Sequence, residues 1–207
     1  GIEAKRNVLR SKLGRLLVKI DNLASRVKND PNYIIVPVPE TSEPIAQGYA
    51  LELGVPERYS RTLHRNTALR NFILDDVSRS LQMGIKYDPN EDELEGKCVM
   101  LFDDSIVRGD TSKNLVRFLI ERCKVKEVHL RIACPPLIGF CPYGIDIRTI
   151  AELEAPKYPR QDLEKKLAES MGADSVLYMS KDLMLDVYEE LGRPRDEHCL
   201  GCITREY

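Results

Sequence analysis

The stretch from Val99 to Val116, VMLFDDSIVRGDTSKNLV, contains residue types that can bind a charged ligand. An apolar run ends on two adjacent carboxylates, Asp103 and Asp104, and the turn after them carries glycine and hydroxyl groups before the pattern becomes helical. In an open parallel sheet, ligands bind outside the carboxyl ends of the strands, where these acids would lie. Carboxylates at such an edge accept hydrogen bonds from sugar hydroxyls or hold hydrated Mg²⁺.

The turn itself suits a phosphate. Residues 105–112 lead into a predicted helix over 112–122, and the first amides of a helix point toward an anion placed before it. Gly109 allows the backbone to approach a ligand closely, while Thr111 and Ser112 add hydroxyl donors. The acids and the turn together fit a ligand with a ribose, a phosphate and a metal. The alternative is an acidic strand end that only caps the helix.

Composition limits the classes of function. With 207 residues and 43% hydrophobic content the chain can bury a full core, and we expect one domain over residues 1–207. The 31 basic and 33 acidic residues leave no basic field for nucleic acid. No apolar run approaches the roughly 20 residues that span a bilayer, and no secretory signal opens the chain. Six irregularly spaced cysteines indicate a reduced, cytoplasmic protein.

The elements that must position these residues alternate between strands and helices, which predicts an α/β fold with a central, mainly parallel sheet flanked by helices. Residues 58–88 have little periodicity and many charges, so we expect a loop that projects from the body and closes over a ligand. Residues 159–207 form a helical segment with a CxxC. The predicted strands are 33–39, 98–102, 127–133 and 175–179, and the predicted helices are 4–28, 44–53, 112–122, 159–171 and 180–191.

The string DDSIVRGDTS, residues 103–112, closely resembles the phosphoribosyl-pyrophosphate (PRPP) motif of type I phosphoribosyltransferases, and DDSIVRG is the form found in glutamine PRPP amidotransferases. The resemblance extends over nearly all of the chain and implies the type I phosphoribosyltransferase fold. It implies that Asp103 and Asp104 hold the ribose hydroxyls and assist Mg²⁺. The family usually has Thr or Asn at the position of Asp110, whose carboxylate must point away from a phosphate. The residues implied to bind the 5′-phosphate of PRPP are Ser105, Arg108, Gly109, Asp110, Thr111 and Ser112.

Two further segments resemble the family. VPVPETS, residues 36–42, is similar to its pyrophosphate loop, which implies that Thr41 contacts Mg²⁺ or pyrophosphate with Ser42 beside it. On the residues alone, Ser42 is equally well explained as the cap of the following helix. YGIDI, residues 143–147, is similar to the YGIDM segment of the family.

The closing loop is where the sequence departs from the family. HRNTALRNFI, residues 64–73, matches a flexible loop that usually reads close to KNRYVGRTFI and folds over PRPP. Arg70 is retained, which implies a catalytic role for it, and His64 and Arg65 would meet pyrophosphate charge. Leu69 stands at the usual glycine, and a leucine does not easily adopt a positive φ, so we expect the closed loop to differ.

The C-terminal CxxC alone indicates a redox pair, half of a zinc site or chance. One branch of the family holds a structural 4Fe-4S cluster with one cysteine before YGID, two in a terminal CxxC and a fourth in the preceding domain. The resemblance therefore assigns Cys141, Cys199 and Cys202 as ligands. Zinc is the alternative to iron, since thiolates suit both metals.

The resemblance implies a glycosyltransferase in which ammonia displaces pyrophosphate at ribose C1 of PRPP, giving phosphoribosylamine for purine biosynthesis. The chain contains no glutaminase segment that begins with a cysteine, so ammonia would come from a glutaminase domain or subunit. The resemblance to the family also implies that the protein is a homo-oligomer. Two alternatives remain open, a phosphoribosyltransferase acting on a purine or on orotate, and a non-catalytic PRPP-binding regulatory module.

Overall fold

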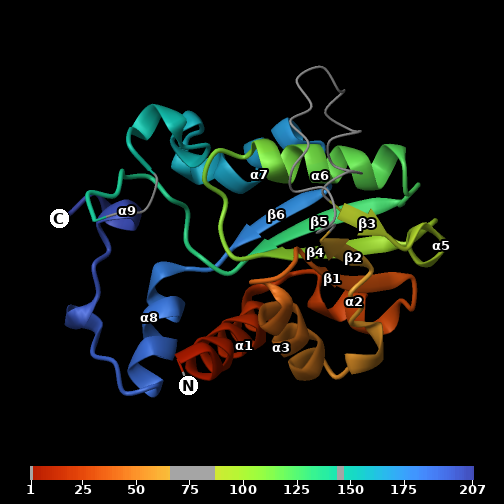
Figure 1. Cartoon of the computed structure of the whole chain (residues 1–207), viewed down its shortest axis with the longest axis horizontal. Helices are drawn as coiled ribbons and strands as arrows, with labels where there is room; N and C mark the ends of the chain where they lie inside the picture. Colours follow the sequence, from red (N-terminus) through yellow and green to blue (C-terminus); the bar gives the residue numbers. More distant parts are fainter. Residues whose placement is uncertain (1, 66–86, 144–146) are drawn as a thin grey trace.

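The computed structural model describes residues 2–65, 87–143 and 147–207, with only the backbone of Arg65. A four-stranded parallel sheet lies at its centre, in the order β1-β4-β5-β6. Helices cover both faces of this sheet (Figure 1). The structure thus confirms the predicted mainly parallel α/β fold. The four strands are β1 (Tyr33–Pro37), β4 (Cys98–Asp103), β5 (Glu127–Ile132) and β6 (Ser175–Tyr178).

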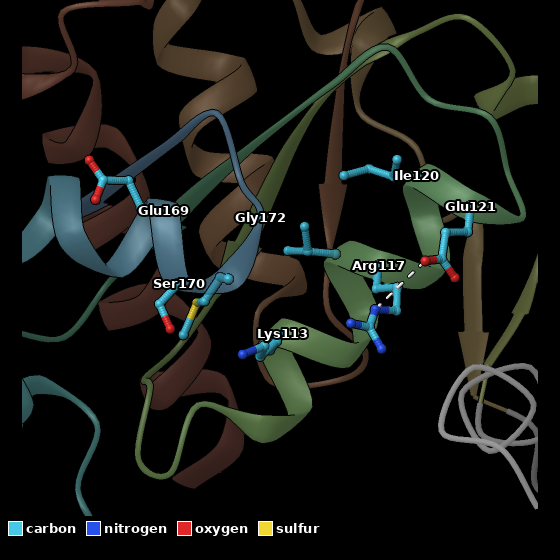
Figure 2. Close-up of a pocket in the computed structure, with 9 residues that line it drawn as sticks. Lys113, Arg117, Ile120, Glu121, Glu169, Ser170 and Gly172 are labelled. Carbon is cyan, nitrogen blue, oxygen red and sulfur yellow. Dashed lines mark ion pairs between the residues drawn. The ribbon is translucent and has the colours of Figure 1, made fainter.

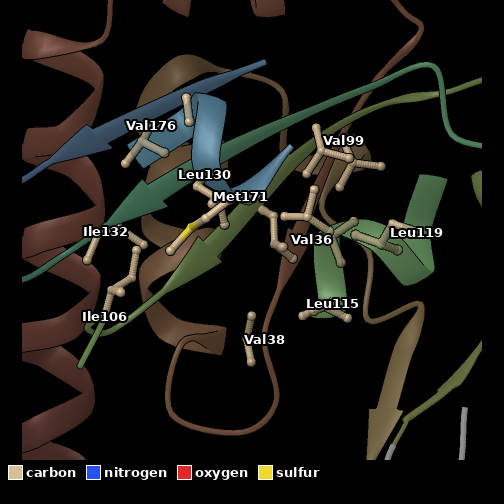
Figure 3. Packing of buried hydrophobic residues seen from close by; sticks show 14 of the residues in the cluster. Val36, Val38, Val99, Ile106, Leu115, Leu119, Leu130, Ile132, Met171 and Val176 are labelled. Carbon is tan, nitrogen blue, oxygen red and sulfur yellow. The ribbon is translucent and has the colours of Figure 1, made fainter. Parts of the chain in front are cut away.

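Each face of the sheet has its own apolar core, because successive strand residues point to opposite sides. Val99 and Leu101 of β4 join the core under α6 (Asp110–Glu121) and α7 (Leu163–Met171), part of which is drawn in Figure 3. Met100 and Phe102 join the opposite core. The helices on that side are α1 (Ile2–Ile20), α3 (Glu43–Leu53) and α8 (Lys181–Glu190), with Val27 of the short α2 (Ala24–Asn29) in the same core.

Shorter elements connect these layers. Strands β2 (Leu63–Arg65) and β3 (Tyr87–Pro89) pair antiparallel and flank residues 66–86, so most of the predicted closing loop lies outside the described residues. None of the helices in the described part of the chain has the length and apolarity needed to cross a bilayer. The remaining elements are α5 (Glu91–Leu94) and α9 (Gly201–Thr204), with 3₁₀ turns at Pro56–Arg58, Ile150–Glu152, Ala155–Lys157, Arg160–Asp162 and Arg195–Glu197.

Two glycines bring α1 and α3 into backbone contact. A Cβ atom on Gly14 would lie 1.9 Å from the carbonyl oxygen of Ile45, and one on Gly48 would lie 2.1 Å from that of Ser11. Each helix therefore uses a glycine to receive a carbonyl of the other, and any larger side chain would force the two helices apart.

The prediction of one helix over residues 4–28 is wrong, because α1 ends at Ile20 and α2 begins at Ala24. Asp21, between them, is buried and its Oδ1 accepts the backbone N–H of Leu23 at 2.9 Å. A side chain that bonds its own backbone in this way competes with the helical hydrogen bonds. The same carboxylate accepts two hydrogen bonds from Arg131 of β5, at 2.6 and 2.9 Å, which fixes the break against the sheet.

Candidate functional site

The two acids of the PRPP-like motif lie at the carboxyl end of β4, partly exposed. Oδ1 of Asp103 accepts the backbone N–H of Asp104 at 2.8 Å and the hydroxyl of Ser42 at 3.2 Å. Ser42 comes from the loop after β1, the strand beside β4. The loops that follow two neighbouring strands are therefore joined through side chains at the edge where parallel sheets bind ligands.

The loop after β1 carries two hydroxyl residues, one buried and one exposed. Ser42 is fully buried and Thr41 is exposed, following a cis peptide bond between Pro39 and Glu40. Ser42 precedes α3, yet its side chain makes no capping hydrogen bond and serves Asp103 instead. Ser42 therefore holds the Asp103 carboxylate, while the exposed side chain of Thr41 remains accessible to a ligand.

The turn after the acids ends at Gly109, which has a φ of 77° and stands as the N-cap of α6. This left-handed conformation, which favours glycine, starts the helix at Asp110, two residues before the predicted start. Asp110 and Thr111 are exposed, whereas Ser112 is buried. Because the first amides of a helix have no partner within it, the start of α6 can donate hydrogen bonds to an anion.

A segment that we did not predict to be part of the site packs on this turn. The backbone N–H of Glu154 donates to the carbonyl of Val107 at 2.8 Å. Glu152 accepts both Nε and Nη2 of Arg108, at 3.1 and 2.5 Å. The Arg108 guanidinium holds the pKa of the Glu152 carboxyl below its ordinary value. Residues 149–158 thus fix the outer side of the turn.

The predicted closing-loop residues are only partly visible. His64 is exposed on β2, opposite Asp88 of β3. Arg65 ends β2, and its side chain lies outside the described residues, as does Arg70 altogether.

Three cysteines pack on one small apolar cluster formed by Leu137, Ile147 and Leu153; they are Cys134, Cys141 and Cys202. Burial raises the pKa of the Cys134 thiol to about 12. It also raises the pKa of the Cys202 thiol, with the nearby Cys141 and Cys199 adding to the shift. Cys199 is exposed, and within the described ranges no three cysteine, histidine or acidic side chains are grouped so that they could hold a metal ion.

An open cleft of about 390 Å³ lies along α6, against the C-terminal end of α7 (Figure 2). Lys113, Arg117 and Glu121 border it from α6, and Glu169 and Ser170 border it from α7. Its lining includes neither the two acids nor the turn after them. The chemistry predicted from the sequence therefore lies elsewhere, at the sheet edge.

The end of β4 and the start of α6 bring hydrogen-bond acceptors and donors to the same edge of the sheet. The Asp103 and Asp104 carboxylates can accept hydrogen bonds, while the first amides of α6 can donate them to an anion. Two carboxylates at a partly exposed edge also fit Mg²⁺, which uses one or two protein carboxylates and takes its remaining ligands from water and phosphate.

Comparison with known proteins gives a consistent result, although no family model matches the chain. The chain is 35% identical over 201 residues to an amidophosphoribosyltransferase of Methanocaldococcus jannaschii, covering 96% of this chain and 39% of the relative. It is 34% identical over 200 residues to that of Archaeoglobus fulgidus, covering 96% and 40%. With that of Mycobacterium tuberculosis it shares 37% identity over 177 residues, covering 84% and 32%. The chain thus spans about two fifths or less of these relatives.

Solved structures agree with the sequence relatives. One is the glutamine PRPP amidotransferase of B. subtilis complexed with ADP and GMP, which matches with a TM-score of 0.78 and 30% identity over 97% of this chain and 42% of that one. Another, described as the allosteric regulatory enzyme of purine biosynthesis, matches with the same TM-score and identity over 97% and 41%.

Proposed function

The chain belongs to the amidophosphoribosyltransferase family, whose members are glycosyltransferases, and from this premise we propose that it transfers the phosphoribosyl group of PRPP to ammonia. The observation that carries the proposal is the string DDSIVRGDTS, which begins at the end of β4 and runs into α6. In the reaction the nitrogen lone pair forms a bond to ribose C1. The electrons of the C1–O bond leave with pyrophosphate, and a proton is released from the new amine.

The chain's own residues would bind and orient PRPP rather than react covalently. We assign the ribose hydroxyls to Asp103 and Asp104, and the 5′-phosphate to the turn 105–109 and the first residues of α6, 110–112. Ser42 would act through its hydrogen bond to Asp103, since it is fully buried. Catalysis by such a site comes from orientation and from stabilising the charge that develops.

Mg²⁺ is part of the proposal, with Thr41, Asp103 and Asp104 as the residues that would hold it. When bound, it would supply positive charge to the departing pyrophosphate. Thr41 is exposed on the neighbouring loop, and the acids are partly exposed, which supports access for a hydrated ion. We assign closure of the site to His64, Arg65 and Arg70, on the resemblance of the loop alone.

Further proposals concern the whole protein, of which this chain matches only a part. We propose that residues 1–207 are the phosphoribosyltransferase domain, that ammonia comes from a glutaminase domain or subunit, and that the protein is a cytoplasmic homo-oligomer. The six free cysteines support a reduced compartment. We also propose that Cys141, Cys199 and Cys202 bind a 4Fe-4S cluster or Zn²⁺, with a further ligand from outside the chain. Iron and zinc analysis of anaerobically purified protein tests this.

The test of the reaction is pyrophosphate release from Mg²⁺-PRPP with ammonium as the acceptor, compared with adenine, hypoxanthine and orotate. We expect release with ammonium only. Release with a base and not with ammonium would replace the proposal by a nucleobase phosphoribosyltransferase. Tight PRPP binding with no release under any condition would replace it by a binding module.

The test of the site is calorimetric binding of Mg²⁺-PRPP to the double variant Asp103→Asn, Asp104→Asn. Loss of charge-assisted hydrogen bonds to the ribose should weaken binding at least about tenfold. The matched control is Asp92→Asn, which neutralises an exposed acid on α5. Unchanged affinity in the double variant would show that the two acids do not hold the sugar.

A further inference from the structure

A buried carboxylate lies directly behind the turn that begins α6. Glu154 is only 8% exposed, and it is bound from both sides. Lys157 donates to its Oε2 at 2.5 Å and the hydroxyl of Tyr158 donates to its Oε1 at 2.9 Å. Since a buried charge is tolerated only when it is paired and hydrogen-bonded, these two donors fix the position of the side chain.

The carbon atoms of Glu154 form a wall against Gly109. A Cβ atom on Gly109 would lie 2.9 Å from Cγ and 3.0 Å from Cδ of Glu154. The backbone of Glu154 holds the same turn two residues earlier, through the 2.8 Å hydrogen bond to the carbonyl of Val107. One residue of the 149–158 segment therefore contacts the turn at two points on either side of Arg108, and Arg108 itself is held by Glu152.

Lys157, which donates to Glu154, also interacts electrostatically with Asp110, the acid that stands where the family usually has Thr or Asn. Its hydrogen bond to Glu154 raises the pKa of Lys157, and the nearby charge of Asp110 adds to the shift.

We infer that Glu154 is a positioning residue, which holds the turn 105–109 so that the first amides of α6 face a phosphate. The phosphate part of this inference rests on the proposed function, whereas the positioning of the turn does not. Nothing in the string AELEAPKYP, residues 151–159, marks Glu154 from sequence alone.

The first experiment measures amide hydrogen exchange of peptides that cover residues 105–112, without ligand, together with calorimetric binding of Mg²⁺-PRPP. Glu154→Ala removes Cγ and Cδ, so we expect exchange in these peptides to become about tenfold faster and PRPP binding about tenfold weaker. Glu154→Gln keeps both carbons and the acceptor for Tyr158, and should stay within about threefold of wild type in both measurements. Equal effects of the two variants would overturn the role of the wall.

The matched control is Glu164→Ala, which removes the carboxylate that accepts the backbone N–H of Tyr178 at 2.8 Å. Exchange in 105–112 should stay at the wild-type rate in this variant, which separates positioning from a general loss of stability. If Glu164→Ala speeds exchange there as much as Glu154→Ala does, the inference is wrong.

A second variant keeps the inference testable if Glu154→Ala does not fold. Lys157→Met with Tyr158→Phe removes both side-chain donors to Glu154, so the unpaired carboxylate should leave its buried position and the turn should exchange faster. Wild-type exchange rates in this variant would overturn the inference. Failure of the wild-type chain to bind PRPP would instead overturn the proposed function, because the exchange comparison decides the positioning role without any ligand.

Discussion

Asp21→Asn should destabilise the protein strongly, because it leaves the charge of Arg131 buried without its counter-ion. Arg131 is 1% exposed, and its Nε and Nη2 both donate to the Asp21 carboxylate. Its Nη1 donates to the carbonyl of Leu130 and the hydroxyl of Ser175. Asp21 also accepts the hydroxyl of Tyr49 at 2.8 Å. The pair joins the break between α1 and α2 to the central strand β5.

The magnitude follows from the burial of both partners, whose side chains are 1% and 0% exposed. Removing one member of a buried ion pair costs about 3–5 kcal/mol of unfolding free energy. For a chain of this size, that loss lowers Tm by roughly 6–20 °C. Replacing both members, as Asp21→Asn with Arg131→Met, leaves no buried charge and should recover most of the loss.

Urea unfolding followed by circular dichroism measures these differences. The control is Glu190→Gln, which breaks the exposed 2.8 Å pair with Lys12 and should cost less than about 1 kcal/mol. The reasoning would be refuted if Asp21→Asn lost no more unfolding free energy than the control, with an unchanged dependence of that free energy on urea concentration. A double variant that is less stable than Asp21→Asn would refute it as well.

Two further outcomes can be measured by the same unfolding assay. Gly48→Ala should lower the free energy of unfolding by about 3 kcal/mol, since its Cβ would lie 2.1 Å from the Ser11 carbonyl oxygen. In the control Gly54→Ala the new Cβ meets no atom within 4 Å, so the loss should be only about 1 kcal/mol, for the positive φ of that residue. Equal losses in the two variants would contradict the backbone contact between α1 and α3. Burial lowers the pKa of the His129 imidazole, although its ring is hydrogen-bonded to Glu127 and Ser175. At mildly acidic pH the unfolded chain therefore binds a proton at this residue that the folded chain excludes. The urea midpoint should therefore fall as the pH drops from 7 to 5, below the unfolded pKa of about 6.5, and His129→Gln should reduce that fall; an unchanged fall would assign it to another group.

The layered fold could be predicted from the sequence because its signals are local. The apolar run before Asp103 ends within one residue of the end of β4, and the helical stripe after it gives α6 within two residues of its observed limits. Each of these patterns depends on neighbours a few positions apart, which a single sequence displays directly. The two acids at the end of β4 are visible for the same reason.

The parts that could not be predicted depend on contacts between distant residues. Asp21 interrupts a helical stripe that continues in phase through Val27, so periodicity conceals the break, and its partner Arg131 lies 110 positions away. Glu154 shows the same difficulty, because an acid in a polar stretch is usually exposed. Only the fold places it against Gly109, where it becomes a buried part of the candidate site.

The hydrogen bond from Ser42 to Asp103 couples the loop after β1 to the carboxyl end of β4. A hydroxyl has a single hydrogen to offer, and in this structure Ser42 directs it at the acid. Any cation that takes over that carboxylate oxygen releases the hydrogen, which can then swing toward another acceptor by rotation about one bond. Binding of a cation at the end of β4 would in this way change the hydrogen bonding of the loop after β1 without moving the backbone of that loop.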